Sequence, residues 1–214
     1  LTTAFAQSGT CVSATQLTIN GACGSGTING TTGLPPTCTG WTRAEYYSFT
    51  ITSAPQTVTI TAVSGTRNLA IGLFSGSCGS LSNIACADAD NTNGVQTETI
   101  TATNLANGTY YIVAGNTRNN DLALTSICIT SPVAPANNLC TNATALPCGT
   151  TNLAGTTVNT ANIAHGTGCS FISNYGVWYT FVGDGNPTTI TTNPSFDIKL
   201  SVSTGTCASM TNIV

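Results

Sequence analysis

The sequence predicts an all-β fold of tandem antiparallel β-sandwich (jelly-roll) modules, stapled by disulfides, with the second module incomplete. Three observations lead to this prediction. Short segments alternate apolar and polar residues, ten cysteines accompany a single histidine, and the second part of the 214-residue chain repeats the first. Together they favour a sulfur-stabilised sheet protein over a helical one.

The alternation is clearest where Val58, Ile60 and Ala62 are separated by threonines. Threonine is β-branched and suits the half-wet face of a sheet without adding charge. Asn107 and Gly108 form a tight-turn signal between two such segments. Further segments with strand character are 47–51, 69–74, 97–102, 109–115 and 122–130. About eight short strands in one module are typical of a two-sheet sandwich.

Four blocks of sequence recur in the same order in the two parts of the chain. Residues 11–17 match 140–146, 46–49 match 178–181, 68–78 match 196–207, and 80–84 match 209–213. Such repetition indicates two copies of one structural unit. It predicts a first module at 7–130, a linker with two prolines at 131–138, and a second module at 139–214 that stops before the later strands.

The cysteines follow the repeat, with six in the first module and four in the second. We expect disulfides rather than a metal site, because mixed zinc sites need histidine and the chain has no C-x-x-C pair. The expected pairs are Cys23–Cys38, Cys78–Cys86, Cys11–Cys128 and Cys148–Cys169, which close short loops locally and tie the ends of the first module together. Six cysteines allow about fifteen pairings, so this pairing is a hypothesis. It leaves Cys140 and Cys207 without partners in the chain and predicts a cysteine directly after Val214.

Oxidised cysteines indicate an exported, extracellular protein. Residues 1–6 support export, because Ala4-Phe5-Ala6 has the small-x-small form of a signal-peptidase site, and a mature chain would then begin at Gln7. The alternative is an ordinary short strand or linker. The sequence contains no run of about eighteen apolar residues, so we expect no transmembrane segment.

Low charge limits the partners. Charged residues make up 5% of the chain, and its only cationic side chains are Arg43, Arg67, Arg118 and Lys199. Nucleic acids and anionic membrane surfaces need many more cations, so neither is an expected partner. The hydrophobic fraction of 41% argues against disorder.

Several motifs resemble the pre-peptidase C-terminal-like (PPC-like) domains. They are the Cys-x-x-Ala-Thr-x-Leu block at 140–146, Val-Trp-Tyr-Thr-Phe at 177–181, and Phe-Asp-Ile-Lys-Leu at 196–200 followed by Ser-Thr-Gly-Thr-Cys at 203–207. In the first module, 86–90 and 108–113 continue the likeness. The closer resemblance is to tandem modules of large secreted Bacteroidota proteins. It implies a jelly-roll fold, export and type IX secretion, and its motifs specify fold better than function.

The sequence predicts no enzyme and no cofactor. His165 is its only imidazole and is expected to lie in an exposed loop, and no nucleophile elbow, zinc-peptidase motif or phosphate loop is present. Asp88 and Asp90, in an Asn-containing segment that ends at Gly94, could supply oxygen ligands to calcium. The alternative, which we favour, is a polar hairpin in which these side chains bond their own backbone.

Aromatic residues suggest both a core and a binding site. Alternation predicts that Tyr47, Phe49, Tyr179 and Phe181 are core residues and that Tyr46 and Trp178 cover the opposite face of the sheet. Trp41 has no counterpart in the second module and is therefore the better ligand-binding candidate.

These observations predict a non-catalytic extracellular structural or adhesive repeat protein at a bacterial cell surface. Its expected partners are other surface proteins or glycans, and the incomplete second module could assemble with another subunit. The alternative is an accessory carbohydrate- or protein-binding module of a larger secreted hydrolase.

Overall fold

The computed structural model describes residues 9–31, 33–35, 38, 40–54, 56–89, 92–160 and 175–213. The chain divides into two compact units, unit one at Leu1–Pro132 and unit two at Val133–Val214. The division falls inside the segment 131–138, and the predicted signal remnant at 1–6 lies outside the described residues. Within the described part of the chain, no helix is long and apolar enough to cross a membrane.

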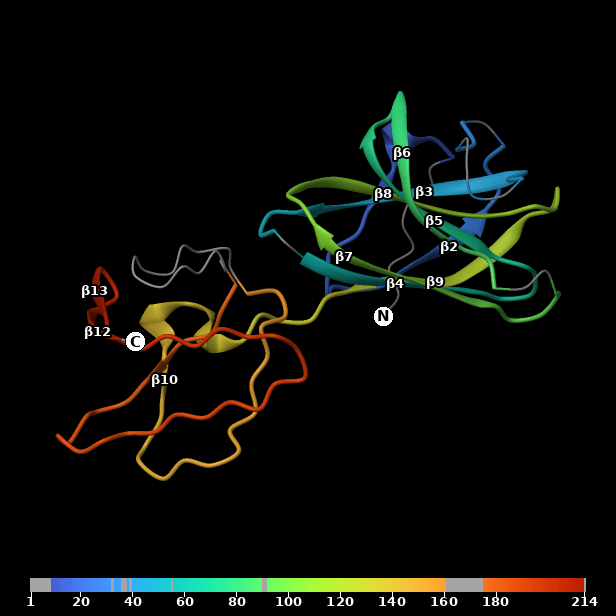
Figure 1. The fold of residues 1–214 in the computed structure, drawn as a ribbon. Helices are drawn as coiled ribbons and strands as arrows, with labels where there is room; N and C mark the ends of the chain where they lie inside the picture. The colour runs from blue at the N-terminus through green and yellow to red at the C-terminus, as the bar shows by residue number, and fades with distance from the viewer. Residues whose placement is uncertain are drawn as a thin grey trace. The chain divides into compact units, whose positions relative to one another are not determined.

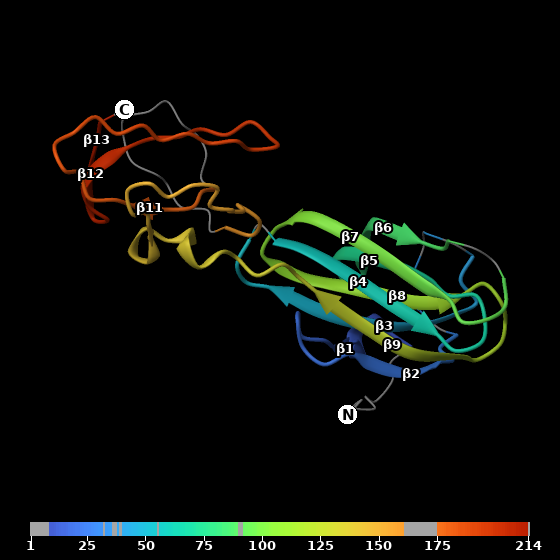
Figure 2. The same cartoon turned by 90° about the horizontal axis from the view of Figure 1, so that it is seen from below.

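Unit one is a sandwich of two β-sheets (Figure 1). One sheet has the strand order β1-β3-β8-β5-β6 and the other the order β2-β9-β4-β7; Figure 2 shows the strands of the second sheet from the side that faces solvent. The strands are β1 Thr15–Gln16, β2 Gly24–Ile28, β3 Arg43–Ile51, β4 Gln56–Ser64, β5 Ala70–Ser77, β6 Ser80–Ala87, β7 Thr97–Leu105, β8 Gly108–Asn116 and β9 Leu122–Thr130, after the short 3₁₀ turn η1 Cys11–Ser13. The predicted all-β, disulfide-stapled sandwich is confirmed.

Strand pairing in unit one is antiparallel except at one edge. The short strand β1 pairs in parallel with β3, with Thr15 opposite Tyr47 and Gln16 opposite Ser48. All other pairs of this unit are antiparallel, and the longest joins β3 to β8 from Arg43↔Asn116 to Ile51↔Gly108.

The period-two pattern places one set of side chains between the two sheets. Val58, Ile60 and Ala62 of β4 are fully buried there, whereas the threonines between them are only partly buried. Tyr47 and Phe49 join the same core, as alternation predicts. Burial of apolar area in this core is the main term that stabilises the unit.

A second apolar cluster lies on the other face of the five-stranded sheet, and we call it the outer cluster. Its buried members are Trp41, Ala44, Tyr46, Ala70, Phe74 and Val113. Leu34 and Cys38, from the segment that leads into β3, pack against it. Because both faces of β5 and β8 are covered, these strands carry nearly continuous apolar runs instead of a strict alternation.

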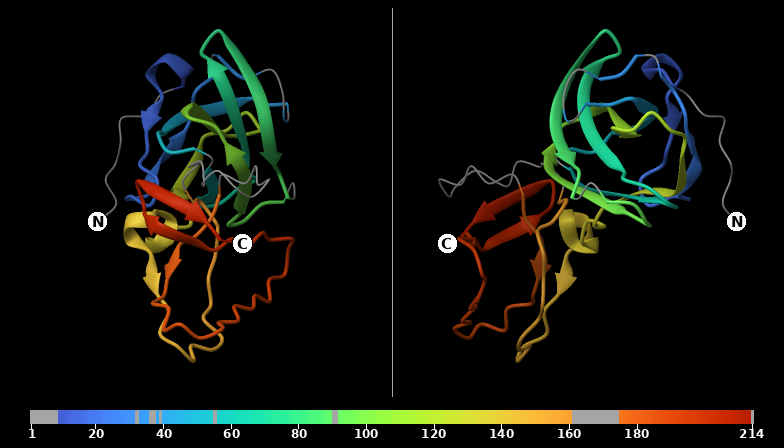
Figure 3. Two further views of the ribbon diagram at one scale, coloured as in Figure 1. Left: turned by 60° about the vertical axis from the view of Figure 1, so that its left-hand side comes forward. Right: turned by 90° about the vertical axis from the view of Figure 1, so that its right-hand side faces the viewer.

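Unit two contains short elements only. They are the 3₁₀ turns η2 Ala136–Asn138 and η3 Cys140–Asn142, the parallel pair β10 Thr144–Ala145 and β11 Tyr179–Thr180, and the antiparallel hairpin β12 Ser203–Thr206 and β13 Ser209–Asn212, drawn in red in Figure 3. The prediction that Tyr179 and Phe181 are core residues is wrong, because their exposed fractions are 36% and 38%. In the described part of unit two, no strand covers them as β8 covers their counterparts.

Candidate functional site

Three disulfides staple unit one, and the predicted pairing is wrong. The structure joins Cys11 to Cys78, Cys23 to Cys128 and Cys38 to Cys86, instead of Cys23–Cys38, Cys78–Cys86 and Cys11–Cys128. The physical reason is strand order, because a sandwich brings segments together that are far apart in the sequence. The pairing of β2 with β9, for example, places Gly24 opposite Ile127 and so brings Cys23 beside Cys128.

Two of these disulfides attach covering segments to the first sheet. Cys38 lies against the outer cluster, and its bond to Cys86 fixes the segment before β3 to strand β6. Gly72 of β5 makes room for this bond, since a Cβ atom there would lie 2.9 Å from the Cys38 Sγ. Cys11 in the η1 turn is tied to Cys78 at the turn between β5 and β6. Each such link stabilises a fold by about 4 kcal/mol when the loop is this long.

Unit two carries the counterpart of one staple. Cys140 is bonded to Cys207, so the prediction that they have no partner in the chain is wrong. The sequence separation is 67 residues, as it is for Cys11 and Cys78. Cys148 is exposed and forms no disulfide with a described residue. Its predicted partner Cys169 lies outside the described residues, so the Cys148–Cys169 pair stays a prediction.

The local geometry around the staple is the same in both units. The amide of Ala14 donates to the carbonyl of Cys11 at 3.2 Å, and the amide of Ala143 donates to that of Cys140 at 3.1 Å. A left-handed residue follows in each unit, Asn20 in one and Gly149 in the other. The parallel strand pairs β1–β3 and β10–β11 also correspond in register.

The hairpin turn that carries the second cysteine is repeated too. Gly76 and Gly205 both have a positive φ, near +101° and +112°. A side chain at either position would be strained and would also meet a carbonyl oxygen, that of Ser80 or of Ser209. These local features of unit one thus recur in unit two, although no described strand of unit two corresponds to β2.

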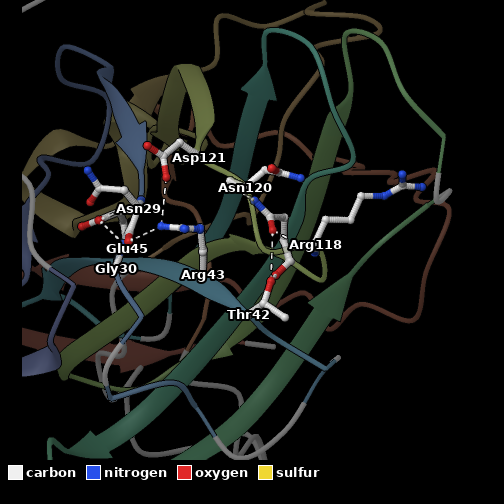
Figure 4. A network of polar contacts seen from close by, with 9 residues as sticks. Asn29, Gly30, Thr42, Arg43, Glu45, Arg118, Asn120 and Asp121 are labelled. Carbon is white, nitrogen blue, oxygen red and sulfur yellow. Dashed lines mark hydrogen bonds and ion pairs between the residues drawn. The ribbon is translucent and has the colours of Figure 1, made fainter.

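A polar cluster surrounds the start of β3 (Figure 4), and we call it the β3 polar cluster. Its members are Asn29, Gly30, Thr42, Arg43, Glu45, Asn116, Arg118, Asn120 and Asp121. Arg43 forms an ion pair with Asp121, Nη1 to Oδ1 at 2.9 Å, and donates from the same nitrogen to the Asn29 carbonyl at 3.0 Å. The buried Glu45 accepts from the amides of Asn29 and Gly30 at 3.3 and 3.1 Å.

Asn116, at the end of β8, joins the other side of this cluster. Its Oδ1 accepts from the Arg118 amide at 2.9 Å, and its Nδ2 donates to the Asn120 carbonyl at 3.0 Å. Thr42 donates to the Asn116 carbonyl through both its amide and its hydroxyl. Carboxylate, guanidinium and amide groups are here bonded mainly to backbone, which is typical of a clamp that holds loops in place.

Trp41, the predicted ligand-binding residue, is buried. Its exposed fraction is 6%, and its ring packs in the outer cluster over Gly115 of β8. A Cβ atom on Gly115 would lie 2.5 Å from the Trp41 Cε3, so the ring lies almost directly on the strand. This burial counts against the predicted role of Trp41 in ligand binding, and local sequence patterns do not indicate that the segment before β3 folds back over the sheet.

The acidic segment after β6 is exposed at Asp88, and Asp90 lies outside the described residues. The Ala89 amide donates to the buried Glu98 carboxylate at 2.9 Å, and the Gly94 amide donates to the Thr66 carbonyl at 3.0 Å. Within the described ranges, no three acidic, His or Cys side chains gather where they could hold a metal ion. Calcium binding at Asp88 and Asp90 therefore stays a prediction. His165 also lies outside the described residues.

Sequence reasoning missed a polar cleft in unit one. It has a volume of about 370 Å³ and lies between the segment after β1 and the β3–β4 connection. Its polar lining consists of Gln16, Thr18, Asn20, Thr50, Thr52, Ser53 and Gln56. These are hydroxyl and amide groups without formal charge, which suit a neutral polar ligand. Only the topology could have found it, because the residues come from two separate segments.

Several solved structures are similar to part of the chain. The pre-peptidase C-terminal domain of collagenase from Bacillus anthracis is 14% identical, with a TM-score of 0.36 over 54% of this chain and 93% of that one. PliG from Aeromonas hydrophila, a periplasmic inhibitor of g-type lysozyme, is 15% identical, with a TM-score of 0.33 over 56% and 97%. The enzymatically active domain of tailspike protein 4 from bacteriophage CBA120 is 8% identical, with a TM-score of 0.31 over 51% and 18%. Likeness at this level assigns no activity.

No curated protein matches the sequence. One family model does. Residues 43–115, which run from the first residue of β3 almost to the end of β8, match the family described as the bacterial pre-peptidase C-terminal domain.

Proposed function

We propose that the chain is a non-catalytic extracellular structural and adhesive repeat, exported and displayed at a bacterial cell surface. The observation that supports it best is the repeated staple, Cys11–Cys78 in unit one and Cys140–Cys207 in unit two. Disulfides persist in oxidising compartments and restrict the unfolded chain, so they suit a protein exposed to extracellular proteases. The resemblance to tandem modules of secreted Bacteroidota proteins makes type IX secretion part of the proposal.

The surface composition supports the same role. With 5% charged residues, the chain has few ion pairs whose strength depends on salt. Hydroxyl and amide groups, such as those of the polar cleft, offer neutral hydrogen bonds to glycans or to other surface proteins. A rigid repeat of this kind can hold an adhesive site away from the cell.

A display experiment tests this role. The chain is placed between a surface anchor and a reporter on a bacterium, and a broad-specificity protease is added. We expect the reporter to persist under oxidising conditions and to be lost quickly once a reductant is present. The matched control replaces the chain with a flexible Gly/Ser linker of equal length. Equal rates of loss for both constructions would contradict the structural role.

The second candidate is an accessory carbohydrate- or protein-binding module of a larger secreted hydrolase. The match of residues 43–115 to the pre-peptidase C-terminal family favours it. Binding of the isolated chain to immobilised polysaccharides and proteins distinguishes the two. If the polar cleft binds the ligand, the double change Thr52→Val and Gln16→Leu abolishes retention, whereas the exposed Val95→Ala leaves it unchanged.

A further inference from the structure

The Cys38–Cys86 disulfide differs from the other two staples of unit one in its exposure. Cys86 is exposed to solvent, whereas Cys38 and the four cysteines of the other two disulfides are half-buried. Cys86 lies on β6, which forms one edge of the five-stranded sheet, and it pairs with Gly72 of β5. A dissolved thiol therefore reaches the Cys86 Sγ more easily than any other disulfide sulfur of this unit.

The backbone of Cys38 is held in a conformation that suits glycine. Its φ is +99°, whereas the other described residues with a positive φ are glycines, or asparagines between +54° and +57°. Asparagine tolerates the left-handed region, but a cysteine at this φ brings its β-carbon close to the backbone and is strained. None of the four cysteines in the other two disulfides of unit one has a positive φ. Opening the Cys38–Cys86 bond is therefore favoured by the relief of strain.

A hydrogen-bond donor lies beside both sulfurs of this disulfide. The Nδ2 of Asn83, also on β6, lies 3.0 Å from the Cys38 Sγ and 3.2 Å from the Cys86 Sγ, and it donates to the Ala85 carbonyl at 3.3 Å. The amide nitrogen carries two hydrogens, so one is left for a sulfur when the other is on the carbonyl. A donor in this position stabilises the thiolate that leaves when the bond opens, and a better leaving group makes exchange faster.

The bond lies on the outer face of the five-stranded sheet. Ala85 and Ala87, on either side of Cys86, pack against the core between the two sheets, so the Cys86 side chain points the other way. Cys38 packs against the outer cluster, as Leu34 does. Opening the bond thus detaches Cys38 from β6 without removing a side chain from the core between the sheets.

We propose that the Cys38–Cys86 disulfide is a site of thiol exchange, which low-molecular-weight thiols open before the other two staples of unit one. The thiolate of the small molecule attacks the Cys86 Sγ, forms a mixed disulfide with it and displaces the Cys38 sulfur as a thiolate. Asn83 donates to the leaving sulfur, which then takes up the proton that the attacking thiol gave to the solvent. A second small thiol resolves the mixed disulfide, so that two thiols are oxidised to one disulfide and both cysteines are reduced. The inference does not depend on the display role.

Glutathione is the probe for this reaction, and the oxidised full chain is its substrate. Samples taken at early times are acidified, their free thiols are alkylated, and the chain is digested without reduction for mass spectrometry. We expect the Cys38–Cys86 link to be lost at least about tenfold faster than the Cys11–Cys78 and Cys23–Cys128 links. Glutathione should be found on Cys86 and the alkyl group on Cys38.

The variant Asn83→Ala tests the role of the donor. It should slow the loss of the Cys38–Cys86 link by at least about threefold, because the leaving thiolate is no longer stabilised. The matched control is Ser82→Ala, which changes the preceding residue of β6, also exposed. This control should leave the rate within about twofold.

The double variant Cys38→Ser and Cys86→Ser tests whether the bond is separable from the core. The Cys11–Cys78 and Cys23–Cys128 links should open within about twofold of their rates in the unchanged chain, because local opening on the outer face leaves the core between the sheets intact. Much faster opening of these two links would mean that the Cys38–Cys86 bond holds the whole unit together, against the proposal.

Three further results would overturn the proposal. The first is loss of all three links of unit one at rates within about threefold of one another. The second is glutathione found mainly on Cys38. The third is opening that is unchanged or faster in Asn83→Ala.

Discussion

Unit one and unit two begin with the same parts and differ in how far those parts are buried. Each has a 3₁₀ turn, a short parallel strand pair, a hairpin with a left-handed glycine, and a disulfide that spans 67 residues. Phe49 is nevertheless fully buried, while its counterpart Phe181 is 38% exposed. The local elements and the disulfide are thus present in both units, whereas full burial of this phenylalanine is found in unit one only.

The difference lies in the strands that come later in unit one. β8 and β9 each lie between two other strands, so they join parts of a sheet that would otherwise stay apart. Their side chains also reach the core, as Ile112 of β8 and Ile127 of β9 do. Formation of the complete sandwich depends on such long-range strand pairing, whereas turns and short strands can form from local sequence alone.

The largest effect is expected at Phe49 and Phe181, the corresponding residues whose burial differs most clearly between the two units. Phe49→Ala removes a fully buried ring and should lower the free energy of unfolding of unit one by about 3–5 kcal/mol. Phe181→Ala should leave the denaturant midpoint of unit one unchanged, because that ring is partly exposed and belongs to unit two. Chemical denaturation followed by fluorescence measures both. Similar losses from the two changes would contradict the comparison.

Removal of a staple is next in size. The double change Cys23→Ser and Cys128→Ser should destabilise unit one by about 2–5 kcal/mol, because it frees a long loop in the unfolded chain. The control is Cys148→Ser, which removes an exposed cysteine without a disulfide partner among the described residues. Thermal unfolding under non-reducing conditions compares them, and equal midpoints for both variants would count against the assigned pair.

A smaller effect tests whether Trp41 packs on the outer face of the five-stranded sheet. Gly115→Ala would push a methyl group against the Trp41 ring and the Arg43 carbonyl, and should cost about 1–3 kcal/mol through overpacking. Gly79→Ala is the matched control, because nothing lies near a side chain at that position. An unchanged stability of Gly115→Ala would mean that Trp41 does not lie on β8.

The smallest expected effect appears at alkaline pH. Burial, and then the charge of Glu45, raises the pKa of Tyr47 above its ordinary value of 10.0, and burial also raises the pKa of Tyr46. The unfolded chain therefore loses these protons first, so the free energy of unfolding should fall as the pH rises above about 10. Denaturation midpoints of fresh samples between pH 8 and 11 would show it. Tyr47→Phe should reduce the fall, and an identical fall in this variant would exclude Tyr47 as a source.

Much of the fold could be predicted from the sequence because strand signals are local. Alternation around Val58 and the turn at Asn107-Gly108 depend on neighbouring residues, and the structure has β4 and the β7–β8 hairpin there. The burial of Tyr47 and Tyr46 on opposite faces of β3 followed from the same alternation.

The disulfide pairs and the burial of Trp41 could not be predicted in this way. Both depend on which distant segments meet, since β2 pairs with β9 and the segment before β3 covers the outer face of its own sheet. The same applies to Phe181, because its burial depends on contacts with strands distant in the sequence and not on its local pattern. A pairing hypothesis that joins cysteines close in the sequence contains no information about contacts between distant segments.

The most direct measurement is disulfide mapping of the oxidised chain by mass spectrometry of its proteolytic fragments, prepared without reduction. The account predicts fragments that join Cys11 to Cys78 and Cys140 to Cys207, so that the same link occurs in both units. Fragments that join Cys11 to Cys128, or free thiols at Cys140 and Cys207, would contradict it.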